Sequence, residues 1–102
     1  MSFIELHLIT EFEWDLAKSE ACLARRGFDF AYAAHAFADP DLLVTVDDRW
    51  DYGEERYRVL AAIEGRVFCV ACTVRWQAVR IISARKANRR EVAHYENSSR
   101  QR

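Results

Sequence analysis

The segment spanning residues 79–95 constrains the fold more than any other part of the sequence, because its hydrophobic period changes once along its length. Its first part alternates as a strand does, which predicts two sets of side chains on opposite faces: Val79, Ile81 and Ser83 on one, and Arg80, Ile82 and Ala84 on the other. Asn88 and Glu91 then form a capping box, which predicts a helix in which Val92 and Tyr95 share a face. The segment therefore predicts a central strand that leads through a basic turn into a C-terminal helix.

Two arginines flank the apolar centre of this strand, and chemistry is expected there. In a regular strand Arg80 and Arg85 point to opposite faces. They converge only if the strand twists or ends before Arg85.

The N-terminal part of the chain carries the start and stop signals of two helices. Asp15 is an expected N-cap for a helix that begins at Leu16, and Gly27 is suited to end it in the left-handed conformation. Asp29 is expected to cap a second helix over residues 30–38, which Asp39-Pro40 stops. Residues 3–9, before these helices, are apolar enough for a strand, which Phe12 and Trp14 continue after a bend.

The middle of the chain has β-strand patterns. Residues 42–46 predict a short strand, and the polar segment 47–54 predicts a loop. Strands over 55–63 and 66–74 are joined by Glu64-Gly65, a two-residue hairpin signal. A short connection over residues 75–78 leads into the next strand.

These patterns together predict one α+β domain over residues 1–102, with 1–11 as an N-terminal extension or strand. Two N-terminal helices pack on an antiparallel sheet of about four strands, and a helix follows at the C-terminus. No apolar run approaches the roughly 20 residues of a membrane-spanning helix, so no membrane is expected as a partner. An odd number of cysteines argues against a disulfide framework, and the cytoplasm is the expected compartment.

The near-neutral total charge conceals an asymmetry. Residues 1–74 carry seven Lys/Arg and fourteen Asp/Glu, a net charge of −7. Residues 75–102 carry eight Lys/Arg and two Asp/Glu, a net charge of +6. A basic face beside an acidic one would suit a nucleic acid and a basic protein partner. The alternative is that the two parts attract each other within one fold.

Metal and redox chemistry are not favoured by the sequence, and no cofactor is expected. Cys69 and Cys72 form a C-x-x-C within a strand, where residues three apart point to opposite faces. No second pair of cysteines completes a zinc site. The three histidines lack metal-like spacing and are His7, His35 and His94.

Metal-free cleavage of RNA remains as a candidate chemistry. It needs a base for the 2′-hydroxyl proton, an acid for the leaving 5′-oxygen, and cations that stabilise the charged transition state. Arg80 and Arg85 suit the last role, unless they form salt bridges with the acidic half. The available proton carriers are Glu54, Glu55, Lys18, His94 and Tyr95.

The chain resembles the BrnT toxins of bacterial type II toxin–antitoxin pairs from about Phe12 to Tyr95. The resemblance is carried by F-E-W-D with Lys18, by the first helix ending at Gly27, by the second helix ending at Asp-Pro, by G-E-E-R over 53–56, by R-I-I-S-A-R over 80–85, and by Glu91 with Tyr95.

This resemblance implies a ribonuclease with a RelE-like fold that blocks translation by cleaving RNA. It implies neutralisation by a BrnA-like antitoxin whose ribbon-helix-helix part binds DNA, so the toxin would meet DNA only indirectly, within a hetero-oligomer. The alternative is a non-catalytic degenerate toxin, or an RNA-binding module, that acts through its antitoxin partner.

The family positions map onto candidate site residues of this chain. The catalytic candidates are Arg80 and Arg85 for the phosphate and its transition-state charge, and Glu55 or Tyr95 as the proton carrier; the RNA-binding candidates are Lys18, Arg56 and Ser83. Two positions depart from the family, Cys22 in place of asparagine and Arg26 in place of histidine. A guanidinium does not deprotonate near neutral pH, so Arg26 cannot act as an acid or base there.

Overall fold

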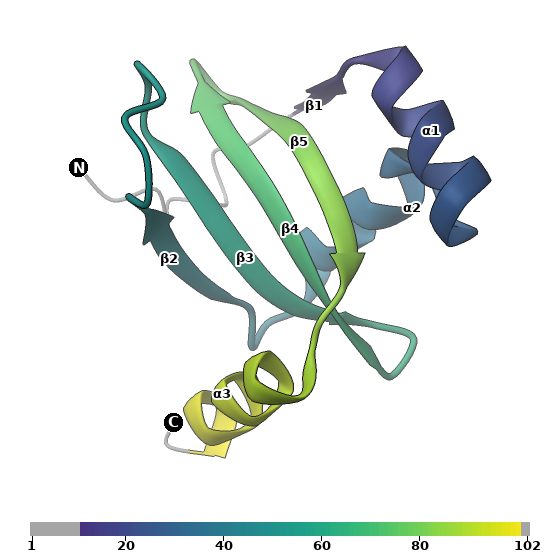
Figure 1. Cartoon of the computed structure of the whole chain (residues 1–102). Coiled ribbons are helices and arrows are strands. Elements are labelled where there is room, and N and C mark those ends of the chain that lie inside the picture. The colour runs from purple at the N-terminus through teal and green to yellow at the C-terminus, as the bar shows by residue number, and fades with distance from the viewer. Residues whose placement is uncertain (1–10, 101–102) are drawn as a thin grey trace.

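The computed structural model describes residues 11–100, which form one mixed sheet with helices on both of its faces (Figure 1). The elements in chain order are β1 (Glu11–Trp14), α1 (Leu16–Arg26), α2 (Phe30–Ala33), the 3₁₀ helix η2 (Ala34–Ala38), β2 (Leu43–Asp47), β3 (Arg56–Ile63), β4 (Arg66–Arg75), β5 (Ala78–Lys86) and α3 (Arg89–Arg100). The predicted strand over residues 3–9 lies outside the described residues. No helix within 11–100 has the length and apolar content needed to cross a membrane.

The sheet has five strands in the order β1-β5-β4-β3-β2. β1 runs parallel to β5, whereas the other neighbours pair antiparallel. The α+β class is confirmed, but the prediction of an antiparallel sheet of about four strands was wrong in strand number and in the direction of this edge pair. Local sequence does not mark the pair, because a parallel partner lies far along the chain: Glu13 and Arg80, which face each other, are 67 positions apart.

The caps of α1 are those that the sequence predicts. The Asp15 carboxylate accepts a hydrogen bond from the Lys18 backbone N–H at 3.0 Å. Gly27 has a φ of 86° and donates its N–H to the Leu23 carbonyl, so it ends the helix in the left-handed region. Cys22 is buried against the sheet, and Arg26 donates to the carbonyl of Ala84 on β5 at 3.3 Å.

The second predicted helix is divided. Asp29 caps it as expected, accepting from the Tyr32 N–H at 2.9 Å, but the α-helical turn ends at Ala33 and continues as η2. The buried residues Phe30, Ala33 and Ala36 are spaced by three. Side chains three apart line up in a 3₁₀ helix, whereas they drift around an α-helix, so the tighter turn keeps Ala36 in the core.

Two apolar clusters lie on opposite faces of the sheet. The larger is packed under α1, α2 and η2, and the smaller lies under α3 at one end of the other face (Figure 1). Cys72 belongs to the larger cluster and Cys69 to the smaller, which confirms that the C-x-x-C side chains point to opposite faces. All three cysteines are free and buried, and burial raises the pKa of Cys69 to about 11 and that of Cys72 to about 12.

Two short hairpins join the last three strands. Glu64 and Gly65 have φ values of 51° and 82°, the pattern of a tight two-residue turn, and they connect β3 to β4 as predicted. Trp76 lies in the turn between β4 and β5 with a φ of 60°, and it is 99% exposed.

Candidate functional site

A register shift in β5 decides which of its side chains lie on which face of the sheet. Ile81 lies opposite Cys72, whereas Ser83 lies opposite Ala71, so Ile82 is an extra residue without an opposite partner. Such a β-bulge interrupts the alternation of side chains by one position. The predicted alternation is therefore wrong beyond Ile81.

The bulge brings the two arginines to the same face. Ala84 is buried in the large core together with Ile81, which places both under the helical layer. Arg80, Ser83 and Arg85 consequently share the opposite face. In a regular strand Arg80 and Arg85 would point to opposite faces, and the one extra residue in β5 brings them to the same face.

This face, opposite α1 and α2 and not covered by α3, is called the open face. Cross-strand pairs place polar residues beside each other on it, as in Thr45 opposite Arg58 and Thr73 opposite Arg80. Its polar residues, from β2, β3, β4 and β5 in turn, are Thr45, Asp47, Arg56, Arg58, Thr73, Arg80, Ser83 and Arg85.

One ion pair fastens α3 to the edge of the open face. Both terminal nitrogens of Arg85 donate to the Glu91 carboxylate, at 2.7 and 2.9 Å. Glu91 also accepts the Asn88 N–H at 2.9 Å, and the Asn88 side chain accepts the Glu91 N–H, which confirms the capping box. The hydrogen bonds from Arg85 are the main reason that the pKa of Glu91 falls to about 2.

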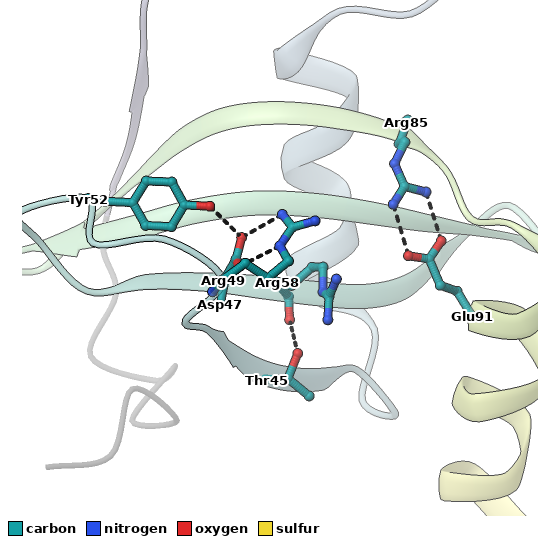
Figure 2. A network of polar contacts seen from close by, with 7 residues as sticks. All are labelled: Thr45, Asp47, Arg49, Tyr52, Arg58, Arg85 and Glu91. Atoms are coloured by element: carbon teal, nitrogen blue, oxygen red, sulfur yellow. Dashed lines mark hydrogen bonds and ion pairs between the residues drawn. The ribbon is translucent and has the colours of Figure 1, made fainter.

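A second pair lies at the other end of the same network (Figure 2). Arg49 donates to both oxygens of the buried Asp47 carboxylate, at 2.8 and 2.9 Å, and the Tyr52 hydroxyl lies 3.5 Å from it. Arg49 lowers the pKa of Asp47 to about 2. Two carboxylates of the network are thus each held by their own arginine.

Arg58 lies between these two pairs (Figure 2). Within residues 11–100 its guanidinium makes no hydrogen bond or ion pair, although its charge adds to those of Arg49 and Arg85 in lowering the pKa of Asp47 and Glu91, respectively. Three arginines therefore face two carboxylates, with a surplus positive charge on the half-buried Arg58.

A pocket of about 410 Å³ opens beside Arg58, between β2, β3 and the first turns of α3. It is called the Arg58 pocket and is lined by Thr45, Arg58, Leu60, Asn88, Arg90, Glu91 and His94. Its walls therefore carry cationic groups, an imidazole and one carboxylate that is already paired.

The other predicted residues of the open face are partly engaged. Arg80 contacts Glu13 through one terminal nitrogen at 3.3 Å. Arg56 lies over the Tyr52 ring at 4.2 Å and 3.7 Å from Glu54, and its Nε is buried without a hydrogen-bond partner among the described residues. Both arginines keep donors that a ligand could use.

Three predicted site residues are not brought to the open face. Lys18 lies on α1, in the layer that covers the other side of the sheet. Glu55 accepts a hydrogen bond from the hydroxyl of Tyr57, whose side chain belongs to the large core. Tyr95 packs in the small core, and its hydroxyl donates to an Asp39 oxygen at 2.6 Å.

Arg58 is the open-face arginine that the sequence analysis did not select as a candidate. The signal was available, because Arg56 and Arg58 stand two apart in a predicted strand and must share a face. His94 was weighed as a proton carrier but not selected. Within residues 11–100 no group of three or more His, Cys, Asp or Glu lies in a metal-binding arrangement.

Comparison with known proteins gives one family. The family model for the ribonuclease toxin BrnT of type II toxin–antitoxin systems matches residues 14–91. No curated protein matches the chain. The matched range contains all the arginines of the open face and ends at Glu91, before His94.

Proposed function

The chain belongs to the BrnT family of ribonuclease toxins of type II toxin–antitoxin systems, and we propose that it blocks translation as a metal-independent endoribonuclease that holds RNA on the open face. The bulge at Ile82 is the observation that carries this proposal, since it gathers Arg80, Ser83 and Arg85 beside the arginines of β3. A row of guanidinium groups suits a phosphodiester backbone, because each offers a planar fork of donors.

The charge chemistry can be supplied by this chain's own side chains. Attack of the 2′-hydroxyl on phosphorus builds negative charge on the non-bridging oxygens, and preorganised cations stabilise it. Arg80 uses one nitrogen for Glu13 and retains further N–H groups. Both terminal nitrogens of Arg85 donate to Glu91. In the proposal, Arg85 therefore holds α3 at the edge of the site and adds positive charge to it.

Family membership implies an antitoxin partner as well as RNA. We propose a BrnA-like antitoxin with a ribbon-helix-helix part that binds DNA, in a hetero-oligomer with this chain. Co-expression with a neighbouring ribbon-helix-helix protein, followed by co-purification, tests this part of the proposal. Failure of the two proteins to associate would contradict it.

The activity is tested with purified protein and RNA in the presence of EDTA. The wild type is expected to cleave, and Arg80→Ala/Arg85→Ala is expected to lose activity at least 100-fold, because two guanidinium groups leave the charged site. Arg66→Ala is the matched control, since Arg66 lies opposite the core residue Ile63 on the other face. Arg80→Gln alone keeps the test decisive if circular dichroism shows the double variant unfolded. Cleavage that survives in the folded variants would contradict the proposal.

A second candidate function is that of a non-catalytic toxin that binds RNA or antitoxin. It is favoured by the carboxylates that already hold Arg80 and Arg85, which would make both arginines structural. RNA binding that weakens steeply with salt, without any cleavage product, would identify this second function.

A further inference from the structure

We propose that the Arg58 pocket binds a phosphate group of the RNA substrate and that His94, in its wall, takes the 2′-hydroxyl proton during cleavage. The inference rests on the proposed function and adds to it the two residues that would act at the scissile phosphate. Arg58 was not predicted as a site residue, and His94 lies beyond the range that the family model matches.

The charge balance of the pocket favours an anion. Its one carboxylate, Glu91, is neutralised by Arg85 and by the Asn88 N–H. Its two guanidinium groups, Arg58 and Arg90, have no hydrogen bond or ion pair within residues 11–100. A negatively charged ligand would therefore give these two guanidinium groups the hydrogen-bond partner that residues 11–100 do not provide.

The position of Arg58 distinguishes it from Arg90. Arg90 is exposed, whereas Arg58 is half-buried between the Asp47 and Glu91 pairs (Figure 2). Water screens a half-buried cation less than an exposed one, so a phosphate bound to Arg58 gains more from each contact. The pocket is continuous with the open face, because Arg58 lies opposite Ala71 and Ala71 opposite Ser83. An RNA backbone that follows this row leads into the pocket.

His94 lies one turn beyond Glu91 on α3 and lines the same pocket. Imidazole changes charge near neutral pH and is the commonest general base in enzymes. The charged or titratable groups that line the pocket with it are Arg58 on β3 and Arg90 and Glu91 on α3. His35, the other described histidine, lies against Tyr32 and lines a different pocket.

The cleavage step forms one bond to phosphorus and breaks another. The 2′-oxygen forms a bond to phosphorus while its proton passes to the neutral His94 ring. The bond from phosphorus to the 5′-oxygen breaks, and that oxygen takes a proton from water. The hydroxide that remains takes the proton from the His94 imidazolium, which restores the neutral ring. The products are a 2′,3′-cyclic phosphate and a 5′-hydroxyl, and Arg58 holds the non-bridging oxygens throughout.

The phosphate site is tested without activity, by titrating the protein with adenosine 3′-monophosphate and following the histidine ring signals by NMR. The His94 signals are expected to shift and those of His35 to stay in place. Arg58→Gln is expected to weaken binding about tenfold or more, since a charge-assisted contact is lost. Arg66→Gln serves as the control and is expected to bind as the wild type does. Equal binding by Arg58→Gln and the wild type would overturn the site.

The proton step is tested by cleavage of RNA in EDTA across pH 5–8. His94→Gln is expected to lower kcat about 100-fold or more and to remove the rise in rate with pH that a histidine base would give, with little change in KM. Wild-type cleavage with an unchanged pH profile in His94→Gln would overturn this inference and leave the proposed function standing. Binding at Arg58 without any cleavage by the wild type would overturn the proposed function and the proton step together, and leave the phosphate site standing.

Discussion

At the scale of single residues, Arg85 and Arg58 differ in how far the donors of their guanidinium groups are already used. Arg85 makes a bidentate contact with Glu91, whereas Arg58 keeps its donors unused within the described residues. The Arg85–Glu91 pair fixes the positions of its two side chains, whereas the Arg58 guanidinium can still donate hydrogen bonds to a ligand. A guanidinium in a strong pair is a poor phosphate anchor, because the anion must first displace a carboxylate.

The Arg85–Glu91 pair makes the stability of the protein depend on pH. The pKa of Glu91 is about 2 in the folded protein against an ordinary value of 4.5, chiefly because of its hydrogen bonds from Arg85. A lowered pKa stabilises the fold fully above the unfolded value, and this contribution is lost as the pH falls from about 4.5 towards 2. Glu91→Gln is therefore expected to cost about 1–3 kcal/mol of unfolding free energy at pH 7.

Urea denaturation at several pH values measures this effect. The difference in unfolding free energy between the wild type and Glu91→Gln should shrink as the pH falls below about 4.5. Glu96→Gln, an exposed position on the same helix, is the matched control. A difference that stays constant down to pH 2 would contradict the assignment.

At the scale of elements, the sequence predicts what depends on neighbours along the chain. The caps at Asp15, Asp29 and Asn88 and the turn at Glu64-Gly65 were all predicted, because each is decided by a few adjacent residues. The parallel pairing of β1 with β5 and the bulge in β5 were not predicted, because both depend on which distant strand lies opposite. The bulge places Arg85 on the open face, so this position could not be predicted from the local sequence either.

The bulge can be tested by deletion. Removal of Ile82 leaves Ile81, Ser83 and Ala84 in strict alternation, so the core and open faces keep their side chains. The variant is expected to unfold cooperatively, with a loss of no more than about 3 kcal/mol. Removal of Val79, which is fully buried, instead moves Arg80 into a core position and is expected to abolish folding.

Thermal unfolding followed by circular dichroism compares these two deletions. If both variants are unfolded, or if the Val79 deletion is as stable as the Ile82 deletion, the assignment of Ile82 as the extra residue is contradicted.

At the scale of the whole molecule, the two oppositely charged parts of the chain meet in the sheet. Arg75 and Arg80 from the basic part pair with Glu54 and Glu13 from the acidic part. Some charges of the two parts thus pair within the fold. This is the alternative that the sequence analysis gave, in which the two parts attract each other. Arg56 and Arg58, from the acidic part, add to the positive charge of the open face instead.

The salt dependence of RNA binding measures this surface. A single-stranded RNA that contacts about three phosphates through Arg56, Arg58 and Arg80 should bind with a log–log salt slope of roughly −2, at about −0.7 for each phosphate. Arg58→Gln should reduce the slope by roughly 0.7, whereas Arg66→Gln should leave it unchanged. Fluorescence anisotropy over a range of salt concentrations checks both, and a slope that is equal in all three proteins would contradict the role of the open face.

The place of β5 in the sheet has a consequence for biosynthesis. β5 is inserted between β1 and β4, yet it is the last strand to leave the ribosome of the five that the structure describes. The strands β2, β3 and β4 can form their antiparallel meander beforehand, but this intermediate lacks Arg80, Ser83 and Arg85. A growing chain consequently carries an incomplete open face until β5 has been translated and inserted between its two neighbours.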